Sequence, residues 1–357
     1  MKKTFTLFLC MVASIMAYAQ SDGFYRVQST TGKNYCMVML DNQSKIDGLN
    51  VDLDAIQLQD IKDLYTHPGS VIYIRSIGNS KYDIEAQGSS LGKLTGGLVY
   101  PQLVKQSDGS YTVWGSYGGV PFYLGATTTY LRLVDGSSDR KFWNLLPIDF
   151  KDNYIGIKPD IKTDDGNYWG TFYASFAFKL HSTGMEAYYV DGANDYTFTM
   201  KKLTGTIPPA TPVIIKCSSD DPADNMIEPV TSNDAAQSGN KIHGIYFDNS
   251  ESGHRNRTKY EAETMRVIGV HDGKLAFVKA TTDYLTNKSY LPHNKCYLNV
   301  SAGAEETIAL TDVLAIGSIE TDNTKAEIYT LTGQKVPEGT SLRPGIYIRN
   351  GKKVVIK

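Results

Sequence analysis

Cysteine is scarce in this sequence of 357 residues, which holds four of them. Cys10 falls in an apolar N-terminal run, so Cys36, Cys217 and Cys296 can form at most one disulfide, and their spacing matches no zinc-binding pattern. A chain of this length has a core large enough to fold without a disulfide scaffold. We therefore expect these three cysteines to be small buried hydrophobic residues, and we predict no metal site.

An excess of charge of one sign is also absent. Lys and Arg number 36 and Asp and Glu number 38, which gives a net charge of -2. This balance argues against binding to nucleic acid or anionic lipid by bulk electrostatics, so we predict no nucleic-acid partner. Hydrophobic residues make up 41% of the chain and charged residues 21%, a composition typical of a folded protein.

Catalytic motifs are missing as well. The histidines are scattered, and there is no HExxH, Gly-x-Ser-x-Gly, phosphate-binding loop or dinucleotide fingerprint. Pairs of acidic residues lie only in polar, turn-like stretches, where solvated loop carboxylates are expected. We predict no catalytic residue and no cofactor. A secreted hydrolase of unrecognised type stays an alternative, because the carboxylates of glycosidases have no short sequence signature.

Long apolar runs are confined to the N-terminus. Lys2 and Lys3 precede the apolar residues 4–16, and residues 17–19 (AYA) fit the small-x-small rule for signal peptidase. We predict that residues 1–19 are a signal peptide and that Gln20 becomes the mature N-terminus. No later stretch approaches about 20 apolar residues, so no membrane span is expected. The mature protein is expected at the cell surface or outside the cell, with association with the outer membrane as one form of this location.

Three segments of the N-terminal region resemble one another. In each, a large apolar residue is followed two positions later by an aliphatic one: Tyr25/Val27, Ile72/Ile74 and Tyr111/Val113. This period of two indicates a half-buried strand, and the glycines that follow indicate a turn and a returning strand. The aliphatic positions are 47 and 39 residues apart. We predict one hairpin per copy, with Val27, Ile74 and Val113 at equivalent core positions.

Threefold repetition at about forty residues is typical of a β-trefoil, in which three hairpin-bearing units close one barrel. We therefore predict an all-β protein whose residues 20–149 form a β-trefoil-like domain. Apolar residues at near-helical spacing within residues 52–65 predict a helix inserted into the first copy. The third copy ends near residues 141–145, whose aromatic side chains are expected to plug the base of the barrel.

Many β-trefoils bind sugars, which makes a carbohydrate-binding accessory protein an alternative. The Gln-x-Trp signature of ricin-type lectins is absent, since none of the three tryptophans has a glutamine two residues before it. The candidates for stacking on a sugar are Trp114, Tyr117 and Tyr130, which lie in turn-rich segments. Ordinary packing of the barrel is the other interpretation of these rings, and the fold alone does not decide between them.

Residues 150–315 alternate short strand-like runs with turns, which is the pattern of an antiparallel β-sandwich. The segments LTGTIPPATPVIIK (203–216) and YLTNKSYLP (284–292) resemble a β-sandwich module that is common in secreted and surface proteins of the Bacteroidetes. Proline fixes φ and cannot stand in the middle of a ladder, so Pro208, Pro209 and Pro212 are expected to stiffen the start of a strand. The resemblance implies structural roles for these motifs and no catalytic residue.

Residues 316–357 contain the most specific motifs of the chain. Short strands are indicated on both sides of Asn350-Gly351, a strong signal for a type I′ hairpin turn. The segments YTLTGQKV (329–336), LRPGIYI (342–348) and GKKVVIK (351–357) resemble the C-terminal sorting domain of proteins exported by type IX secretion in the Bacteroidetes, without its Pro-Asn-Pro opening. The resemblance implies that the secretion machinery is a partner. A small terminal sheet without a sorting role is the other interpretation.

Together these patterns predict an exported, non-catalytic binding protein at the bacterial cell surface. We expect a signal peptide (1–19), a β-trefoil-like domain (20–149), a β-sandwich domain (150–315) and a sorting-like tail (316–357). The expected ligand is a glycan or a surface protein.

Overall fold

A computed structural model describes residues 20–31, 34–42, 46–47, 50–91, 101–117, 119–248, 256–311, 328–330, 334–336, 345–349 and 352–356. The predicted signal peptide and the connector before the tail lie outside these residues. The protein is all-β, as the sequence predicts. The chain divides into two compact units, Met1–Leu310 and Thr311–Lys357, so the predicted boundary at residues 149 and 150 falls inside the first unit.

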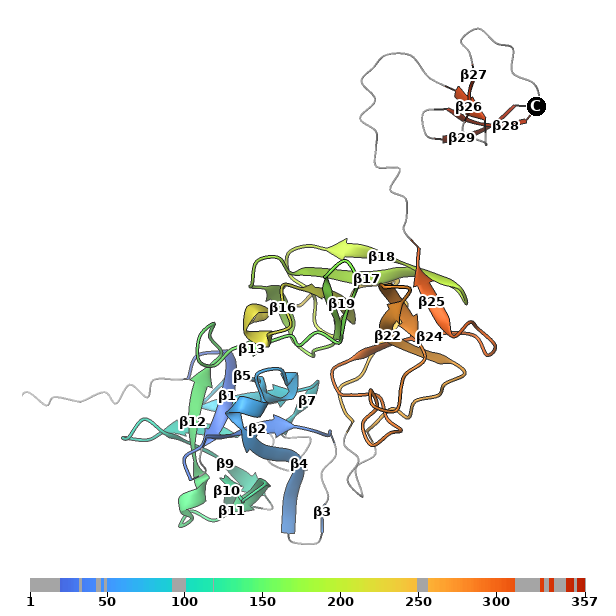
Figure 1. Cartoon of the computed structure of the whole chain (residues 1–357). Coiled ribbons are helices and arrows are strands. Elements are labelled where there is room, and N and C mark those ends of the chain that lie inside the picture. Colours follow the sequence, from blue (N-terminus) through green and yellow to red (C-terminus); the bar gives the residue numbers. More distant parts are fainter. Residues whose placement is uncertain are drawn as a thin grey trace, which may run out of the picture. The chain divides into compact units, whose positions relative to one another are not determined.

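The described strands up to residue 147 belong to one curled sheet (Figure 1). They are β1 (Gly23–Ser29), β2 (Tyr35–Met39), β3 (Ile46–Asp47), β4 (Asn50–Asp60), β5 (Ile72–Gly78), β6 (Lys81–Ala86), β7 (Ser89–Ser90), β8 (Gln102–Lys105), β9 (Tyr111–Tyr117), β10 (Val120–Ala126), β11 (Tyr130–Val134) and β12 (Phe142–Pro147). Three short 3-10 helices accompany them: η1 (Ile61–Asp63), η2 (Pro68–Ser70) and η3 (Asp139–Lys141).

This sheet closes on itself. The strands pair around a ring in the order β1-β5-β6-β8-β9-β12 and back to β1, and every pairing in the ring is antiparallel. The predicted hairpins are present as the antiparallel pairs β1–β2, β5–β6 and β9–β10. Closure leaves none of the ring strands as an edge, which removes the unpaired backbone groups that an open sheet presents.

The core of the barrel lies inside this ring. Val27, Ile74 and Val113 are 2%, 1% and 2% exposed and belong to one apolar cluster, which confirms that all three are core residues. Trp143 is fully buried in the same cluster, and its indole N–H donates to the carbonyl of Leu124 at 2.9 Å. The buried ring therefore keeps its polar edge satisfied, as a buried tryptophan must.

The helix predicted within residues 52–65 is wrong. Residues 50–60 form the strand β4, which pairs with β2 and β11, and only η1 follows it. Ile56 and Leu58 are buried on one side of β4, which is the alternation of a strand. The spacing looks helical because it joins two elements: Ile56 and Leu58 belong to β4, whereas Ile61 begins η1 and Leu64 caps its end.

The rest of the first unit contains a three-stranded and a ten-stranded sheet. The order is β13-β20-β16 in the first and β14-β15-β19-β17-β18-β25-β23-β22-β24-β21 in the second. The strands are β13 (Ile155–Gly156), β14 (Ile161–Lys162), β15 (Tyr168–Phe172), β16 (Ala177–Leu180), β17 (Glu186–Ala193), β18 (Thr197–Leu203), β19 (Val213–Cys217), β20 (Met226–Val230), β21 (Ile242–Gly244), β22 (Met265–His271), β23 (Lys274–Val278), β24 (Cys296–Asn299) and β25 (Thr307–Leu310), with the 3-10 helix η4 (Pro222–Asp224) before β20.

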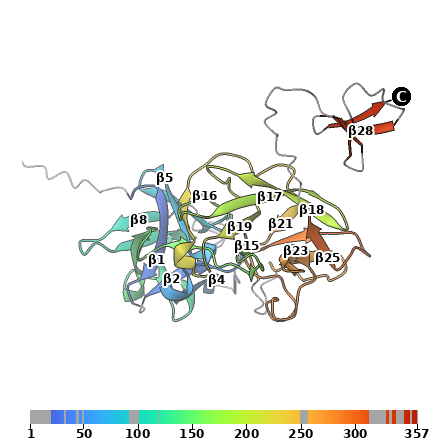
Figure 2. The same cartoon turned by 45° about the horizontal axis from the view of Figure 1, so that its top comes forward.

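The ten-stranded sheet curls around its own core (Figure 2). One apolar cluster joins Trp169 of β15, near one end of the strand order, to Ile242 of β21, at the other end. The backbone N–H of Cys296 in β24 donates to the hydroxyl of Thr171 in β15 at 3.1 Å. Strands far apart in the pairing order thus meet across the core, because the twist of a long sheet brings its ends together.

All three cysteines are buried and free, which confirms the expectation for them. Burial raises the pKa of Cys36, Cys217 and Cys296 to about 12. The thiols therefore stay protonated at neutral pH and act as small apolar side chains.

The second unit carries one four-stranded sheet in the order β27-β26-β28-β29. Its strands are β26 (Ile328–Thr330), β27 (Lys335–Val336), β28 (Gly345–Arg349) and β29 (Lys352–Ile356). Arg349 of β28 stands opposite Lys352 of β29, so the two strands form the predicted hairpin, while Asn350 and Gly351 themselves lie outside the described residues.

Candidate functional site

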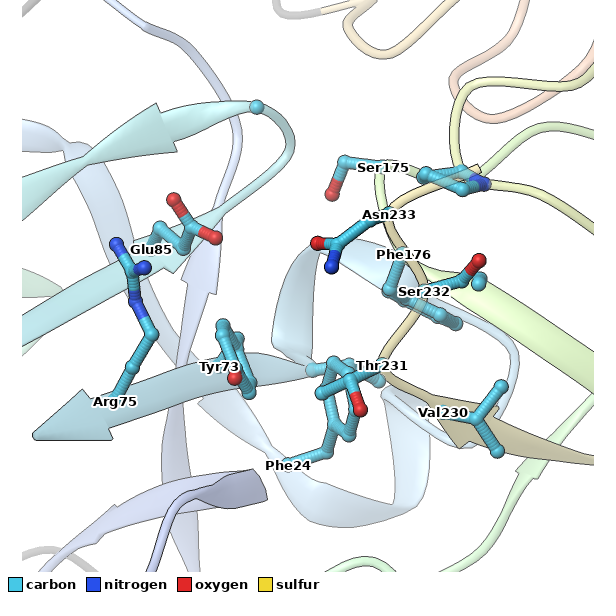
Figure 3. Close-up of a pocket in the computed structure, with 14 residues that line it drawn as sticks. Phe24, Tyr73, Arg75, Glu85, Ser175, Phe176, Val230, Thr231, Ser232 and Asn233 are labelled. Atoms are coloured by element: carbon cyan, nitrogen blue, oxygen red, sulfur yellow. The ribbon is translucent and has the colours of Figure 1, made fainter. Parts of the chain in front are cut away.

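A cleft of about 350 Å³ separates the outer wall of the barrel from residues 175–177 and 230–233 (Figure 3). Phe24, Tyr73, Arg75 and Glu85 form the barrel side of this cleft. Its volume is near the lower end of the range for small-molecule sites, about 300–1,000 Å³.

The alternation of side chains along the strands determines which barrel residues face the cleft. Tyr73 and Arg75 alternate along β5 with the buried Ile72 and Ile74, so the polar and aromatic side chains point outward. Glu85 of β6 and Phe24 of β1 stand directly opposite Tyr73 in the two neighbouring strands. Residues opposite one another in adjacent strands share a face, so these four side chains gather on one outer patch.

Aromatic rings form the floor of the cleft. The rings of Phe24 and Tyr73 are 4.9 Å apart, and Phe24 also lies 5.7 Å from the ring of Phe176, which comes from the loop before β16. Tyr73 is half-buried, and burial is the first cause that raises the pKa of its hydroxyl. The ring of Tyr73 stays neutral and partly open to the cleft.

Glu85 contributes a carboxylate to the cleft. Among the described residues no hydrogen bond or ion pair reaches this carboxylate, whereas the neighbouring Arg75 is paired with Asp83 at 2.8 Å. Burial first, and then the Asp83 carboxylate, raise the pKa of Glu85, while Arg75 acts in the opposite direction. The side chain therefore faces the cleft with both oxygens available to a ligand.

The opposite side of the cleft presents neutral polar groups. Ser175 precedes β16, and residues 231–233 form an irregular segment after β20. Figure 3 shows Ser175 and Asn233 on the side facing Glu85, with Tyr73 and Phe24 between the two sides. In the part of the chain that the structure describes, no hydrogen bond to the Ser175 hydroxyl or the Asn233 amide is formed. Both groups can donate and accept.

The cleft contains few ionisable groups. Glu85 is the one carboxylate among the residues that line the cleft in the described structure. A glycosidase needs two carboxyl groups that face each other across the substrate. Nor do the described residues hold a group of three His, Cys, Asp or Glu side chains able to bind a metal. The cleft offers donors, acceptors and an aromatic surface.

The residues predicted to stack on a sugar lie on other strands. Trp114 is half-buried on β9, with its ring 6.3 Å from Tyr123 of β10. Tyr130 begins β11, half-buried, opposite Gln57 of β4. Tyr117 ends β9, and its side chain lies outside the described structure. Trp114 thus has Tyr123 as its aromatic neighbour, and the role of the three residues stays a prediction.

Sequence reasoning missed the cleft because its two sides are about 90 to 210 residues apart. Tyr73 and Arg75 did carry a signal, as the outward positions of an alternating strand. Residues 175 and 231–233 carry none, because serine, threonine and asparagine in a loop are the ordinary composition of a turn.

Comparisons with known proteins add little. No family model matches the chain, and the search of curated proteins found no match. One solved structure that matches is described as that of a mosquitocidal holotoxin, with 10% sequence identity and a TM-score of 0.26. The match covers 80% of this chain and 42% of the toxin chain, so this protein spans less than half the length of that one. A similarity at this level carries no argument about fold or function.

Among the described residues, no helix has the length and apolar character that crossing a bilayer requires.

Proposed function

We propose that this protein is an exported, non-catalytic binding module that acts at the cell surface and holds a small polar ligand in the cleft. The observation that carries this proposal is the set of unpaired polar groups around the aromatic floor. These groups are half-buried or exposed, so water can reach them, and a polar ligand can take the place of that water without losing hydrogen bonds. Convergent polar groups over apolar rings are the usual composition of a ligand site.

We also propose that the barrel is a β-trefoil and that the following sheets form a β-sandwich module. The closed ring of six strands and the hairpin in each predicted repeat support the first assignment. The curled sheet around the cluster of Trp169 and Ile242, antiparallel except for the pair β18–β25, supports the second. A rigid barrel wall is well suited to hold one side of a binding site in place.

Export and surface attachment are part of the same proposal. They rest on the composition of residues 1–19 and on the resemblance of residues 316–357 to a sorting domain. A small sheet whose strands pair among themselves, such as β26–β29, suits a signal that another protein reads.

The test is a binding screen on the mature chain by saturation-transfer NMR, with methyl glycosides, amino acids, nucleosides and dicarboxylates as probes. At least one class is expected to bind and to be recovered unchanged, and the double variant Tyr73→Ala/Asn233→Ala is expected to abolish its signal. Tyr196→Ala is the matched control, because Tyr196 is 65% exposed and does not line the cleft. Turnover of a probe, absence of any binder, or binding that survives the double substitution would each overturn the proposal.

A further inference from the structure

We infer that the ligand of the cleft is a neutral pyranose sugar whose apolar face lies on the ring of Tyr73. The inference rests on the proposed function and names its ligand class. It follows from three features of the cleft: the ring on its floor, its charge, and the arrangement of its polar groups.

The floor suits a ligand with one apolar face. The ring of Tyr73 lies 4.9 Å from that of Phe24, which in turn lies 5.7 Å from the ring of Phe176, so Tyr73 packs against one apolar ring. An aromatic ring attracts C–H groups through its negative face, and a rigid ring binds at a low entropic cost. A pyranose presents several axial C–H groups on one face and hydroxyls at its edge.

The charge of the cleft disfavours an anionic ligand. An anion would meet the unpaired carboxylate of Glu85, and the nearby cation of Arg75 is already paired with Asp83 at 2.8 Å. A cation would be attracted by Glu85, and Arg75, paired with Asp83, does little to oppose it, so the charge of the cleft argues against anions alone. The choice of a neutral ligand over a cation rests on the polar groups of the facing side.

The polar groups match hydroxyls. A carboxylate accepts only, so Glu85 takes hydrogen bonds from ligand O–H groups, and a hydroxyl donor to an ionised acceptor makes a strong hydrogen bond. Ser175 and Asn233, on the facing side, both donate and accept, which fits a hydroxyl that has already donated to Glu85 (Figure 3). A sugar edge offers neighbouring hydroxyls that can do both at once.

The size of the cleft sets the length of the ligand. At about 350 Å³ it holds one or two sugar rings, and the exposed side chains of Arg75, Thr231 and Asn233 stand at its rim. The site therefore suits the end of a glycan, with the remaining rings in solvent.

The inference is tested by isothermal titration of the mature chain with the methyl glycosides of glucose, galactose, mannose and N-acetylglucosamine. Free glucuronate, arginine and adenosine serve as anionic, cationic and aromatic probes. At least one neutral glycoside is expected to bind with a dissociation constant on the order of 1 mM, a value usual for so few contacts, and the other three probes at least about tenfold more weakly.

Substitutions locate the binding. Tyr73→Ala and Glu85→Gln are each expected to weaken the glycoside about tenfold, whereas Tyr73→Phe, which keeps the ring, should change binding less than about threefold. Trp114→Ala is the matched control on the barrel and should leave binding unchanged. Thermal melts verify that each variant is folded. If Tyr73→Ala does not fold, Asn233→Ala in the exposed segment carries the test.

Two results separate this inference from the proposed function. If glycosides fail to bind while another probe binds in the cleft, the sugar is the wrong ligand and the binding module stands. If Trp114→Ala abolishes sugar binding and the cleft variants do not, the sugar site lies on the barrel face and the inference falls.

Discussion

Arg26 of β1 is a fully buried cation held by neutral acceptors. Its guanidinium donates to the side chain of Asn153 at 2.6 Å and to the carbonyls of Leu64 and Tyr154 at 2.9 and 2.8 Å. Burial lowers the pKa of Arg26 to about 10, so the group remains charged at neutral pH. The planar fork of arginine is what allows one side chain to join the barrel to the loop that leaves it.

We predict that Arg26→Lys lowers the free energy of unfolding by about 2–4 kcal/mol, measured by urea denaturation. An ammonium group cannot reach all of these acceptors. The buried side-chain oxygen of Asn153 would lose its donor, whereas the carbonyl of Leu64 would keep the N–H of His67 at 3.0 Å. Arg75→Lys is the control, because this exposed arginine makes a surface ion pair and should change stability by less than about 1 kcal/mol. Equal effects of the two substitutions would contradict the role of Arg26.

Among single residues, the sequence predicts burial where apolar residues recur with the period of a strand. The alternation around Val27, Ile74 and Val113 identified three core residues, because burial is set by a repeated local pattern. The role of Arg26 could not be predicted, since arginine in a strand is normally a surface residue and its partner Asn153 is 127 positions away.

Strands were predictable where they are regular. Within residues 150–315 the alternation of apolar and polar residues predicts strands at 197–203, 265–270 and 274–279, which are β18, β22 and β23 to within a residue at each end. The strand β20 gives a weaker signal, because it contains Pro229, which lacks the N–H that a ladder needs. The structure accommodates this proline because β13 pairs only with Met226 and Ile227, which leaves that side of the strand without a neighbour at residue 229.

The turn η2 is joined to the second half of the first unit by stacked histidines. The ring of the buried His67 lies 4.0 Å from the ring of His293, nearly parallel to it, and its Nδ1 accepts from the backbone N–H of Gly69 at 3.1 Å. Burial, and then the charges of His293 and Arg26, hold the pKa of His67 well below its usual value. The folded protein thus keeps this ring neutral.

We predict that His67 makes the protein less stable as the pH falls. Below about pH 6.5 the unfolded chain protonates this histidine and the folded chain does not. The free energy of unfolding therefore keeps its full value above that pH and falls by up to about 1.4 kcal/mol per pH unit below it. His67→Asn keeps an acceptor for Gly69 and should lose less stability between pH 7 and pH 5 in urea titrations. His271→Asn, at an exposed position, should follow the wild type. Parallel curves for all three proteins would refute the prediction.

For the whole molecule, composition and local motifs predicted the all-β class but not the cleft. The cleft exists because β1 and β5 of the barrel lie beside the segments around β16 and β20, and such long-range packing leaves no trace in spacing or motif. The same holds for the amide pair of Gln87 and Asn294, which are 207 positions apart and exchange hydrogen bonds at 3.0 and 3.1 Å. Sites built from loops of distant segments are the hardest to read from a single sequence.

The tail gives the last prediction. Among the described residues, β26, β27, β28 and β29 pair with one another in one four-stranded sheet. About thirty residues also bury too little apolar area to be essential to a core several times larger. A chain that ends at Asp312 should therefore melt within about 2 °C of the full-length protein.

If the tail is a sorting signal, the same truncation should move the protein from the cell surface to the periplasm, as measured by fractionation and surface labelling. A collapsed melt would show that the tail supports the fold, and surface display that persists without it would show that export does not depend on these residues.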